Sequence, residues 1–311
     1  MQFSEILSPL SLGNFTSSIF GNRIFHLPGA SDKFTSLISW EDIDSILSNS
    51  LLTSQRIKIY QKGALVPWSR YAMEVPRYPD VKNSSSFKTR LDLNSIKRLM
   101  DDGASLVINQ IDELSDTVGE LATGIAREIG EEVYVNAYLS RGTDPGFNMH
   151  WDDHEVIVLQ VSGHKHWTIH PPTLKNPLRF GPQPMQSDLT DENKIDLLLS
   201  QGDFLHLPRG WWHLVTPINE PSLHLTIGLT RRNGVHFIHW LADRLGEEEE
   251  IRRNIPLDDE SKKYTQILKE VLSRQEENGD LVAEFLHEHR KRILSTYREN
   301  SDAWRVSGNS E

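Results

Sequence analysis

Hydrophobic and polar positions change their spacing along the chain. Residues 39–47 and 115–129 carry apolar side chains three or four positions apart, as on one face of a helix, whereas residues 56–60 alternate as in a strand. Residues 133–230 consist of short alternating or apolar segments separated by turns, and helical spacing returns after residue 232. This order predicts a β-rich centre between helical flanks.

Start and stop signals delimit the helices expected in the first part of the chain. Ser39 is a good N-cap for the first of them, with acidic residues in its first turn. A helix over residues 93–102 ends at Gly103, and one over residues 115–129 ends at Gly130. Residues 78–87 are polar and predict a loop.

Short strands at regular spacing are typical of a sandwich or barrel. We expect strands at residues 56–60, 105–109, 133–139, 155–161, 165–170, 204–207, 213–216 and 223–229.

The last part of the chain predicts further helices. An apolar stripe must be buried either on the barrel of the same chain or against a second protomer. The charged residues 247–250 predict a junction between two parts of the chain. The following residues to 293 are expected to be helical, and the last dozen residues are expected to lack regular structure. The stripe that leads us to expect a homodimer consists of Val235, Ile238, Leu241, Ala242 and Leu245.

Composition narrows the class of protein. The longest apolar stretches are about five residues, far from the roughly 18 of a membrane-spanning helix, so no membrane association is expected. The first residues lack a basic start and an apolar stretch, which argues against secretion, and the absence of cysteine excludes disulfides and thiolate sites. We therefore expect a cytoplasmic protein. A net charge of −11 disfavours nucleic acid and favours a basic protein or peptide partner.

Two histidines and one carboxylate form a candidate metal site. His150 and Asp152 are two positions apart, so on a strand both side chains point to the same face. His213, from a second strand, can complete the set. Two histidines and one carboxylate leave one face of an octahedral ion open, which is the arrangement of non-haem Fe(II) oxygenases. The alternative for the first two residues alone is a surface pair at the start of a strand.

Lys165 is the second chemical clue. It shares the alternation of Trp167 and Ile169, so a strand that turns these residues inward buries an ammonium group. A buried ammonium is costly unless it meets an anion. We expect the anion to be the distal carboxylate of 2-oxoglutarate; the alternative is that the side chain reaches solvent from an edge strand. The opposite face, expected to be solvated, carries His164, His166 and His170.

Polar side chains also alternate with apolar ones on two further strands. Such a face indicates either a wet cavity or an ordinary solvated or hydrogen-bonded surface. His154, in phase with Asp152, either lines a substrate entrance or packs. The alternating polar residues are Tyr134, Asn136 and Tyr138 on one strand and His224 and Thr226 on the other.

Residues 145–167 closely resemble the core of JmjC-domain cupin oxygenases, and the nearest branch is the ribosomal oxygenases, which are protein hydroxylases. The pattern His-x-Asp, Gln, Gly-x-Lys-x-Trp and then Gly-Asp…Pro-x-Gly-x-x-His is present in order. The resemblance covers roughly residues 5–245. It implies a mainly β fold with α elements, a double-stranded β-helix (cupin or JmjC jelly roll) over residues 91–232. An N-terminal α/β segment (1–90) and a C-terminal helical region (233–311) flank it.

The resemblance also implies the roles of residues. His150, Asp152 and His213 would bind Fe(II), and Lys165 would bind 2-oxoglutarate, with O2 as the oxidant. The resemblance also implies that Asn136 and Tyr138 lie near the cosubstrate. From the alternation of their own strand we expect His224 and Thr226 to line the same interior and to contribute to cosubstrate binding.

The expected activity is hydroxylation of a side chain in a protein or peptide. Alternatives are a methyl-lysine demethylase or an RNA-nucleoside hydroxylase of the same fold, a metal-dependent isomerase, and a non-catalytic cupin that binds a small acid or a partner. The sequence departs from the ribosomal enzymes at Trp211-Trp212-His213, which is more like the asparaginyl hydroxylase of the hypoxia pathway. About 75 residues follow the barrel, enough for dimerisation helices but short for a winged helix.

Overall fold

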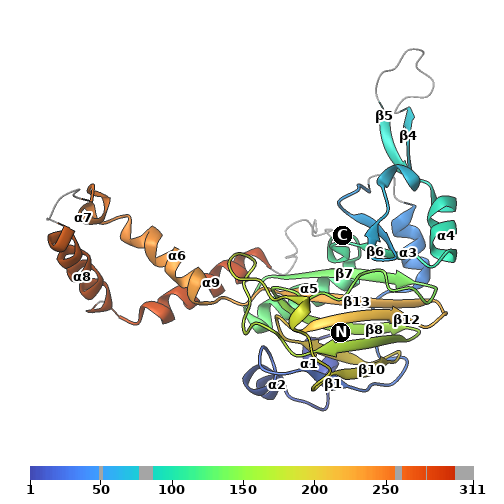
Figure 1. Ribbon diagram of the computed structural model, residues 1–311, viewed down its shortest axis with the longest axis horizontal. Coiled ribbons are helices and arrows are strands. Elements are labelled where there is room, and N and C mark those ends of the chain that lie inside the picture. Colours follow the sequence, from blue (N-terminus) through green and yellow to red (C-terminus); the bar gives the residue numbers. More distant parts are fainter. Residues whose placement is uncertain (49–51, 77–86, 256–260, 278, 298–311) are drawn as a thin grey trace, which may run out of the picture. The chain divides into compact units, whose positions relative to one another are not determined.

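The computed structural model describes residues 1–48, 52–76, 87–255, 261–277 and 279–297 (Figure 1). The chain divides into two compact units. The first unit contains Met1–Ile129 and Val133–Thr230, and the second contains Gly130–Glu132 and Arg231–Glu311. The loop predicted from residue 78 lies outside the described residues as far as residue 86, and so do the last dozen residues.

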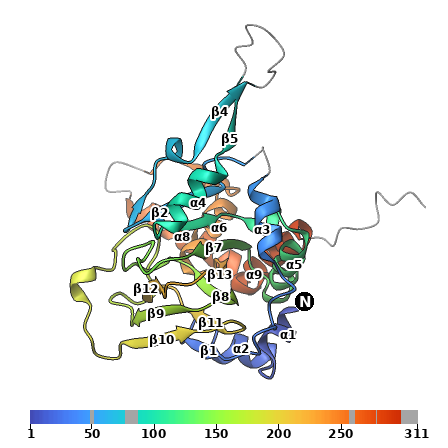
Figure 2. The ribbon, with the colours of Figure 1, turned by 90° about the vertical axis from the view of Figure 1, so that its right-hand side faces the viewer.

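Antiparallel pairing builds the sheets of the first unit (Figures 1 and 2). A three-stranded sheet has the order β10 (Ile195–Leu199), β9 (Lys165–His170), β12 (Trp212–Pro217), and β4 (Ala72–Pro76) pairs with β5 (Phe87–Leu91). The largest sheet has the order β1 (Phe25–Leu27), β11 (Phe204–Leu207), β8 (Glu155–Ser162), β13 (Ser222–Leu229), β7 (Val133–Ser140), β6 (Ser105–Ile108), β2 (Ile57–Gln61), β3 (Ala64–Leu65).

The large sheet and the three-stranded sheet pack face to face. Trp167, Ile169 and Leu199 of the smaller sheet form one buried cluster with residues of β8 and β11. Two facing antiparallel sheets of this kind form the double-stranded β-helix, so the predicted fold class is confirmed. The residues of the large sheet in this cluster are Val156, Val158, Leu205 and Leu207.

The predicted helices of the first unit are present. Ser39 caps α3 (Trp40–Leu47): its hydroxyl accepts a hydrogen bond from Asp42 N at 3.1 Å, and the Asp42 carboxylate accepts one from Ser39 N. Gly103 and Gly130 follow α4 (Leu93–Asp101) and α5 (Asp116–Ile129) with positive φ. The remaining helices are α1 (Phe3–Leu7), α2 (Leu12–Ser18) and the 3₁₀ turns η1 (Trp68–Arg70), η2 (Ile111–Glu113) and η3 (Gln186–Asp188).

All eight predicted strands are found to within one or two residues, but β1, β3, β4, β5 and β10 were not predicted. In β10 the pattern fails because three of its five residues are exposed and no alternation is present. This strand is recognised by its pairing with β9, where Leu199 lies opposite Lys165, and not by its own spacing.

The second unit is helical. Phe237 and Trp240 of α6 (Gly234–Leu245) pack against Phe285 of α9 (Leu281–Thr296). The apolar stripe predicted for α6 lies largely outside this contact, since Val235 is 44% and Ile238 58% exposed. The other helices are α7 (Glu249–Arg252) and α8 (Ser261–Glu277). None of the helices in the described part of the chain is long and apolar enough to cross a membrane.

Candidate metal centre

An antiparallel bridge brings the two predicted histidine ligands together. His150 N donates to His213 O at 3.1 Å, and His213 N donates to His150 O at 2.7 Å. His213 lies on β12, but His150 and Asp152 lie in the connection before β8 and not on a strand. The expectation that strand alternation aligns these two side chains was therefore wrong, because the bridge and the turn after it orient them.

The structure places His150, Asp152 and His213 as a compact group of three ligands. One ligand atom from each lies within 4.8 Å of the other two, and Asp152 Oδ2 is 3.5 Å from His213 Nε2. The imidazole centroids are 4.2 Å apart. Two imidazoles and one carboxylate converging in this way suit a divalent transition metal that retains open positions.

Backbone carbonyls fix the tautomer of both histidines. His150 Nδ1 lies 2.8 Å from Asn148 O, and His213 Nδ1 lies 3.2 Å from Trp211 O. A carbonyl only accepts, so each Nδ1 donates and each Nε2 keeps its lone pair for a metal. Burial and the neighbouring His150 lower the pKa of His213 to about 4, so its imidazole is neutral, as a ligand must be.

The triad opens into a cavity of about 250 Å³ between the two sheets. Every cosubstrate residue predicted from the sequence lies in its wall. The wall consists of Ser105, Tyr134, Asn136, Tyr138, Gly146, Phe147, His150, Asp152, His154, Val156, Lys165, Trp167, His213, Val215, Pro217, His224 and Thr226.

Lys165 is buried at one end of this cavity. Its side chain is turned inward with Trp167 and Ile169, as predicted, and the residue is 3% exposed. Its Nζ lies 3.0 Å from His224 Nδ1 and 3.4 Å from Tyr138 O, and it has no carboxylate partner among the described residues. Burial lowers the pKa of Lys165 to about 7.

The groups around Lys165 are neutral. Burial and the Lys165 charge lower the pKa of His224 well below its usual value, so His224 accepts a hydrogen bond from the ammonium. Tyr138 stacks on His224 with 4.9 Å between ring centroids, and burial and Asp152 raise its pKa, so it remains a phenol. Asn136 and Thr226 line the same wall.

The predicted solvated histidine face is only partly correct. His164 and His166 have side chains 40% and 41% exposed. His170 is buried at 7%, because the connection between β9 and β10 covers it and its Nδ1 lies 3.0 Å from Thr190 O. This contact joins positions 20 residues apart within a long connection, which the strand pattern does not encode.

Two aromatic residues of the site had no predicted role. Trp167 stacks on His213 with 5.7 Å between centroids, and its buried Nε1 has no hydrogen-bond partner among the described residues. Phe147 lies 5.8 Å from His150, centroid to centroid, and 4.2 Å from Tyr60. The alternation of β9 indicated that Trp167 is buried, but Phe147 lies in a connection without regular spacing.

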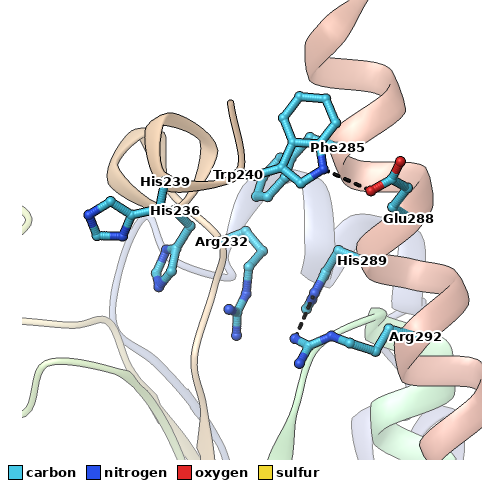
Figure 3. A pocket seen from close by; sticks show the side chains of 8 residues that line it. All are labelled: Arg232, His236, His239, Trp240, Phe285, Glu288, His289 and Arg292. Atoms are coloured by element: carbon cyan, nitrogen blue, oxygen red, sulfur yellow. Dashed lines mark hydrogen bonds between the residues drawn. The ribbon is translucent and has the colours of Figure 1, made fainter. Parts of the chain in front are cut away.

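A second cavity, of about 260 Å³, lies within the second unit (Figure 3). Several of its polar groups pair with one another or with Glu131 and Glu132. Trp240 Nε1 donates to Glu288, His289 Nε2 lies 2.9 Å from Glu131, and Arg232 and Arg292 form salt bridges with Glu131 and Glu132. These contacts join α6 and α9 to residues 130–132 and explain the cavity as part of the packing of this unit.

Comparisons with known proteins agree with a metal site formed by two histidines and one carboxylate. A jelly roll with a His-x-Asp…His triad defines the cupin class of metal-dependent oxygenases. The family model described as "JmjC domain" matches residues 114–237 of this chain.

Relatives match the same part of the chain. The protein named bifunctional lysine-specific demethylase and histidyl-hydroxylase NO66 of Drosophila persimilis is 34% identical over 133 residues, which is 40% of this chain and 19% of the relative. Human ribosomal oxygenase 1 is 33% identical over 166 residues, 50% of this chain and 26% of the relative. The aligned part thus spans no more than about a quarter of these two relatives.

Among solved structures, YcfD, a ribosomal oxygenase from Escherichia coli, has a TM-score of 0.53 at 16% identity and covers 92% of this chain and 69% of that chain. YcfD in complex with cobalt and 2-oxoglutarate has a TM-score of 0.51 at 15% identity, covering 93% of this chain and 71% of that one. At this identity the likeness shows the fold. The predicted resemblance to JmjC oxygenases of the ribosomal branch is confirmed.

The buried ammonium makes a prediction for the protein without metal or cosubstrate. The pKa of Lys165 is lower in the folded than in the unfolded chain, so charging it costs stability below about pH 7, and this cost disappears as the pH rises toward 10.5. Lys165→Met should therefore raise the free energy of unfolding by about 1–4 kcal/mol at pH 7. The gain should shrink by pH 10, as measured by urea denaturation. The exposed variant Lys175→Met is the control; equal effects of both variants would contradict the assignment.

Proposed function

We propose that the chain is an Fe(II)- and 2-oxoglutarate-dependent oxygenase that hydroxylates a side chain of a protein or peptide. The observation that carries this proposal is the ammonium of Lys165, buried without a described carboxylate in the same cavity as the triad. A metal-dependent isomerase has no need of a buried cation beside the metal site, and a complete triad of metal ligands beside Lys165 argues against a non-catalytic cupin.

The donor set fits Fe(II). His150 and His213 would bind it through Nε2, because their Nδ1 atoms donate to carbonyls, and Asp152 would supply the carboxylate oxygen. Bound Fe(II), with O2 and 2-oxoglutarate, supplies an oxidation that inserts one oxygen atom into a C–H bond and yields succinate and CO2.

The chain's own residues bind and orient the cosubstrate. Lys165 would donate a charge-assisted hydrogen bond to the distal carboxylate of 2-oxoglutarate, an anion that removes the cost of burying the ammonium. His224 stays neutral and accepts from Lys165, so it adds no competing positive charge. The phenol of Tyr138, the amide of Asn136 and the hydroxyl of Thr226 supply the neutral wall beside it. Burial between the sheets keeps bulk water away.

The nature of the substrate is a proposal that rests on the relatives. Their names include histidyl hydroxylation and lysine demethylation, and demethylation remains the second candidate activity. A protein or peptide substrate agrees with the charge of −11, which disfavours nucleic acid.

Removal of one ligand tests the activity. In the wild type we expect Fe(II)-dependent conversion of 2-oxoglutarate to succinate, and in Asp152→Ala we expect a loss of at least about 100-fold in Mn(II) affinity and in turnover. Mn(II) binding is measured by electron paramagnetic resonance and succinate by mass spectrometry. Asp188→Ala, which removes an exposed carboxylate, is the control. Failure of the wild type to bind 2-oxoglutarate in anaerobic calorimetry with Mn(II) would contradict the cosubstrate assignment.

Binding of 2-oxoglutarate should depend on pH. An anion beside Lys165 raises its pKa above the value of about 7 in the free protein, so binding takes up a proton above pH 7. The Kd should rise by up to about tenfold per pH unit between pH 7 and 9. Calorimetry in two buffers of different ionisation enthalpy measures the proton uptake. Lys165→Arg, which keeps its charge over this range, should remove the slope; a slope equal to that of the wild type would refute this explanation.

The apolar stripe of α6 underlies our proposal of a homodimer. Val235 and Ile238 are too exposed for an apolar face with no partner. We expect a dimer in light scattering at micromolar concentration and a monomer for Ile238→Glu, with the substitution of exposed Lys291 by Glu as the control; a monomeric wild type would refute it. A cytoplasmic location and the division of the chain at residues 90 and 232 likewise remain proposals.

A further inference from the structure

The end of the cavity away from Lys165 is lined by Tyr134 and His154. Tyr134, Asn136 and Tyr138 point into the cavity from the same face of β7. Tyr134 is four residues from Tyr138, so along an extended strand their Cα atoms are about 13 Å apart. Because Lys165 contacts Tyr138 O, Tyr134 lies farther along β7 from the cosubstrate end, on the cavity wall that also contains His154.

A chain of hydrogen bonds holds the hydroxyl of Tyr134. Tyr134 Oη lies 2.8 Å from His154 Nε2, and His154 Nδ1 lies 3.2 Å from Asp153 Oδ1. A carboxylate only accepts, so His154 Nδ1 donates to it whether the ring is neutral or protonated. The ring of His154 is therefore oriented by Asp153, and it presents Nε2 to the phenol.

The backbone of β13 packs against the ring of Tyr134. Gly228 lies directly opposite Tyr134 in the register of β7 and β13. A Cβ at Gly228 would lie 2.2 Å from Tyr134 Cζ, so the ring occupies the space that any other residue would fill. The position of the hydroxyl is thus set by the sheet on one side and by His154 on the other.

The hydroxyl keeps hydrogen-bonding capacity for a ligand. A phenol can donate one hydrogen bond and accept two, and in the described part of the chain His154 is the one partner of this hydroxyl. Burial and the carboxylate of Asp152 raise the pKa of Tyr134, so the group remains a neutral phenol.

Charges at this end of the cavity are of both signs. Asp152 and Asp153 disfavour an acidic side chain. The hydrogen bond from His154, and to a smaller extent the Arg179 guanidinium, lowers the pKa of Asp153, which therefore stays a carboxylate. A side chain that can donate or accept a hydrogen bond matches the capacity left on the Tyr134 hydroxyl.

We propose that Tyr134 positions the reacting side chain of the substrate beside the triad by a hydrogen bond, with His154 and Asp153 as positioning residues that act through it. The matching substrate side chain is one that can donate or accept a hydrogen bond, as opposed to an apolar one. This inference rests on the proposed function. The competing explanation is that the same bonds only fasten the connection between residues 150 and 154 to β7.

Peptide binding tests the proposal without turnover. The probes are three capped nine-residue peptides that differ only in the central residue, which is histidine, asparagine or leucine. Their Kd values are measured by calorimetry at pH 7.5 on the full chain loaded with Mn(II) and 2-oxoglutarate without O2. We expect the histidine or asparagine peptide to bind about tenfold more tightly than the leucine peptide, the ratio of one net hydrogen bond of about 1.4 kcal/mol.

Variants separate positioning from fastening. Tyr134→Phe should abolish the preference over leucine, and His154→Leu should do the same, with no further loss in the double variant, because His154 acts through Tyr134. His154→Gln, whose amide can still bond the hydroxyl, should restore part of the preference. Tyr71→Phe is the matched control, since it removes another buried phenol that donates to a carbonyl, that of Ile57, outside the cavity.

The outcomes distinguish this inference from the proposed function. A wild type that binds 2-oxoglutarate but shows no preference among the three peptides, or additive losses in the double variant, would overturn the role of Tyr134 alone. A wild type that binds neither metal nor 2-oxoglutarate would overturn the proposed function. Equal loss of thermal stability in the Tyr134, His154 and Tyr71 variants, with an unchanged peptide preference, would favour the fastening explanation.

Discussion

The metal centre depends on the antiparallel bridge between His150 and His213. Its two backbone hydrogen bonds fix the distance between a connection that leads into the large sheet and a strand of the smaller sheet. Gly210 N donates to Asp152 O at 2.9 Å and holds the third ligand in the same network. Because all three ligands belong to this network and both Nδ1 atoms donate to carbonyls two residues earlier, backbone geometry sets the directions of the ligand atoms.

Electrostatics divides the cavity into two ends. Lys165 is the cation at one end, and Asp152 supplies the carboxylate of the triad. Three other ionisable side chains of the cavity stay neutral, since burial disfavours the imidazolium of His224 and the phenolates of Tyr134 and Tyr138. A dicarboxylate bound between Lys165 and a metal held by the triad would have a partner of opposite charge at each end. Such a ligand would explain why a lysine is buried beside the neutral side chains of His224 and Tyr138.

Much of this arrangement follows from alternation in the sequence. In β7 the apolar residues Val133, Val135 and Ala137 are buried, and the polar residues between them face the cavity. In β9 the same rule placed Lys165 inward. Alternation failed where side chains are oriented by contacts distant in sequence, as for Asp152, which follows an isolated bridge, and for His170, which a long connection covers.

The pairing of β7 with β13 shows what a single strand pattern lacks. The register sets Tyr138 opposite His224, Asn136 opposite Thr226 and Tyr134 opposite Gly228, so two polar faces that are recognisable separately become three cross-strand pairs in one wall. The first pair stacks beside Lys165. The last pair combines a tyrosine with a glycine, and Gly228 appears in the sequence as an ordinary strand glycine. Only the register shows that its missing side chain makes room for the ring of Tyr134, and therefore that the phenol can reach His154 at the substrate end.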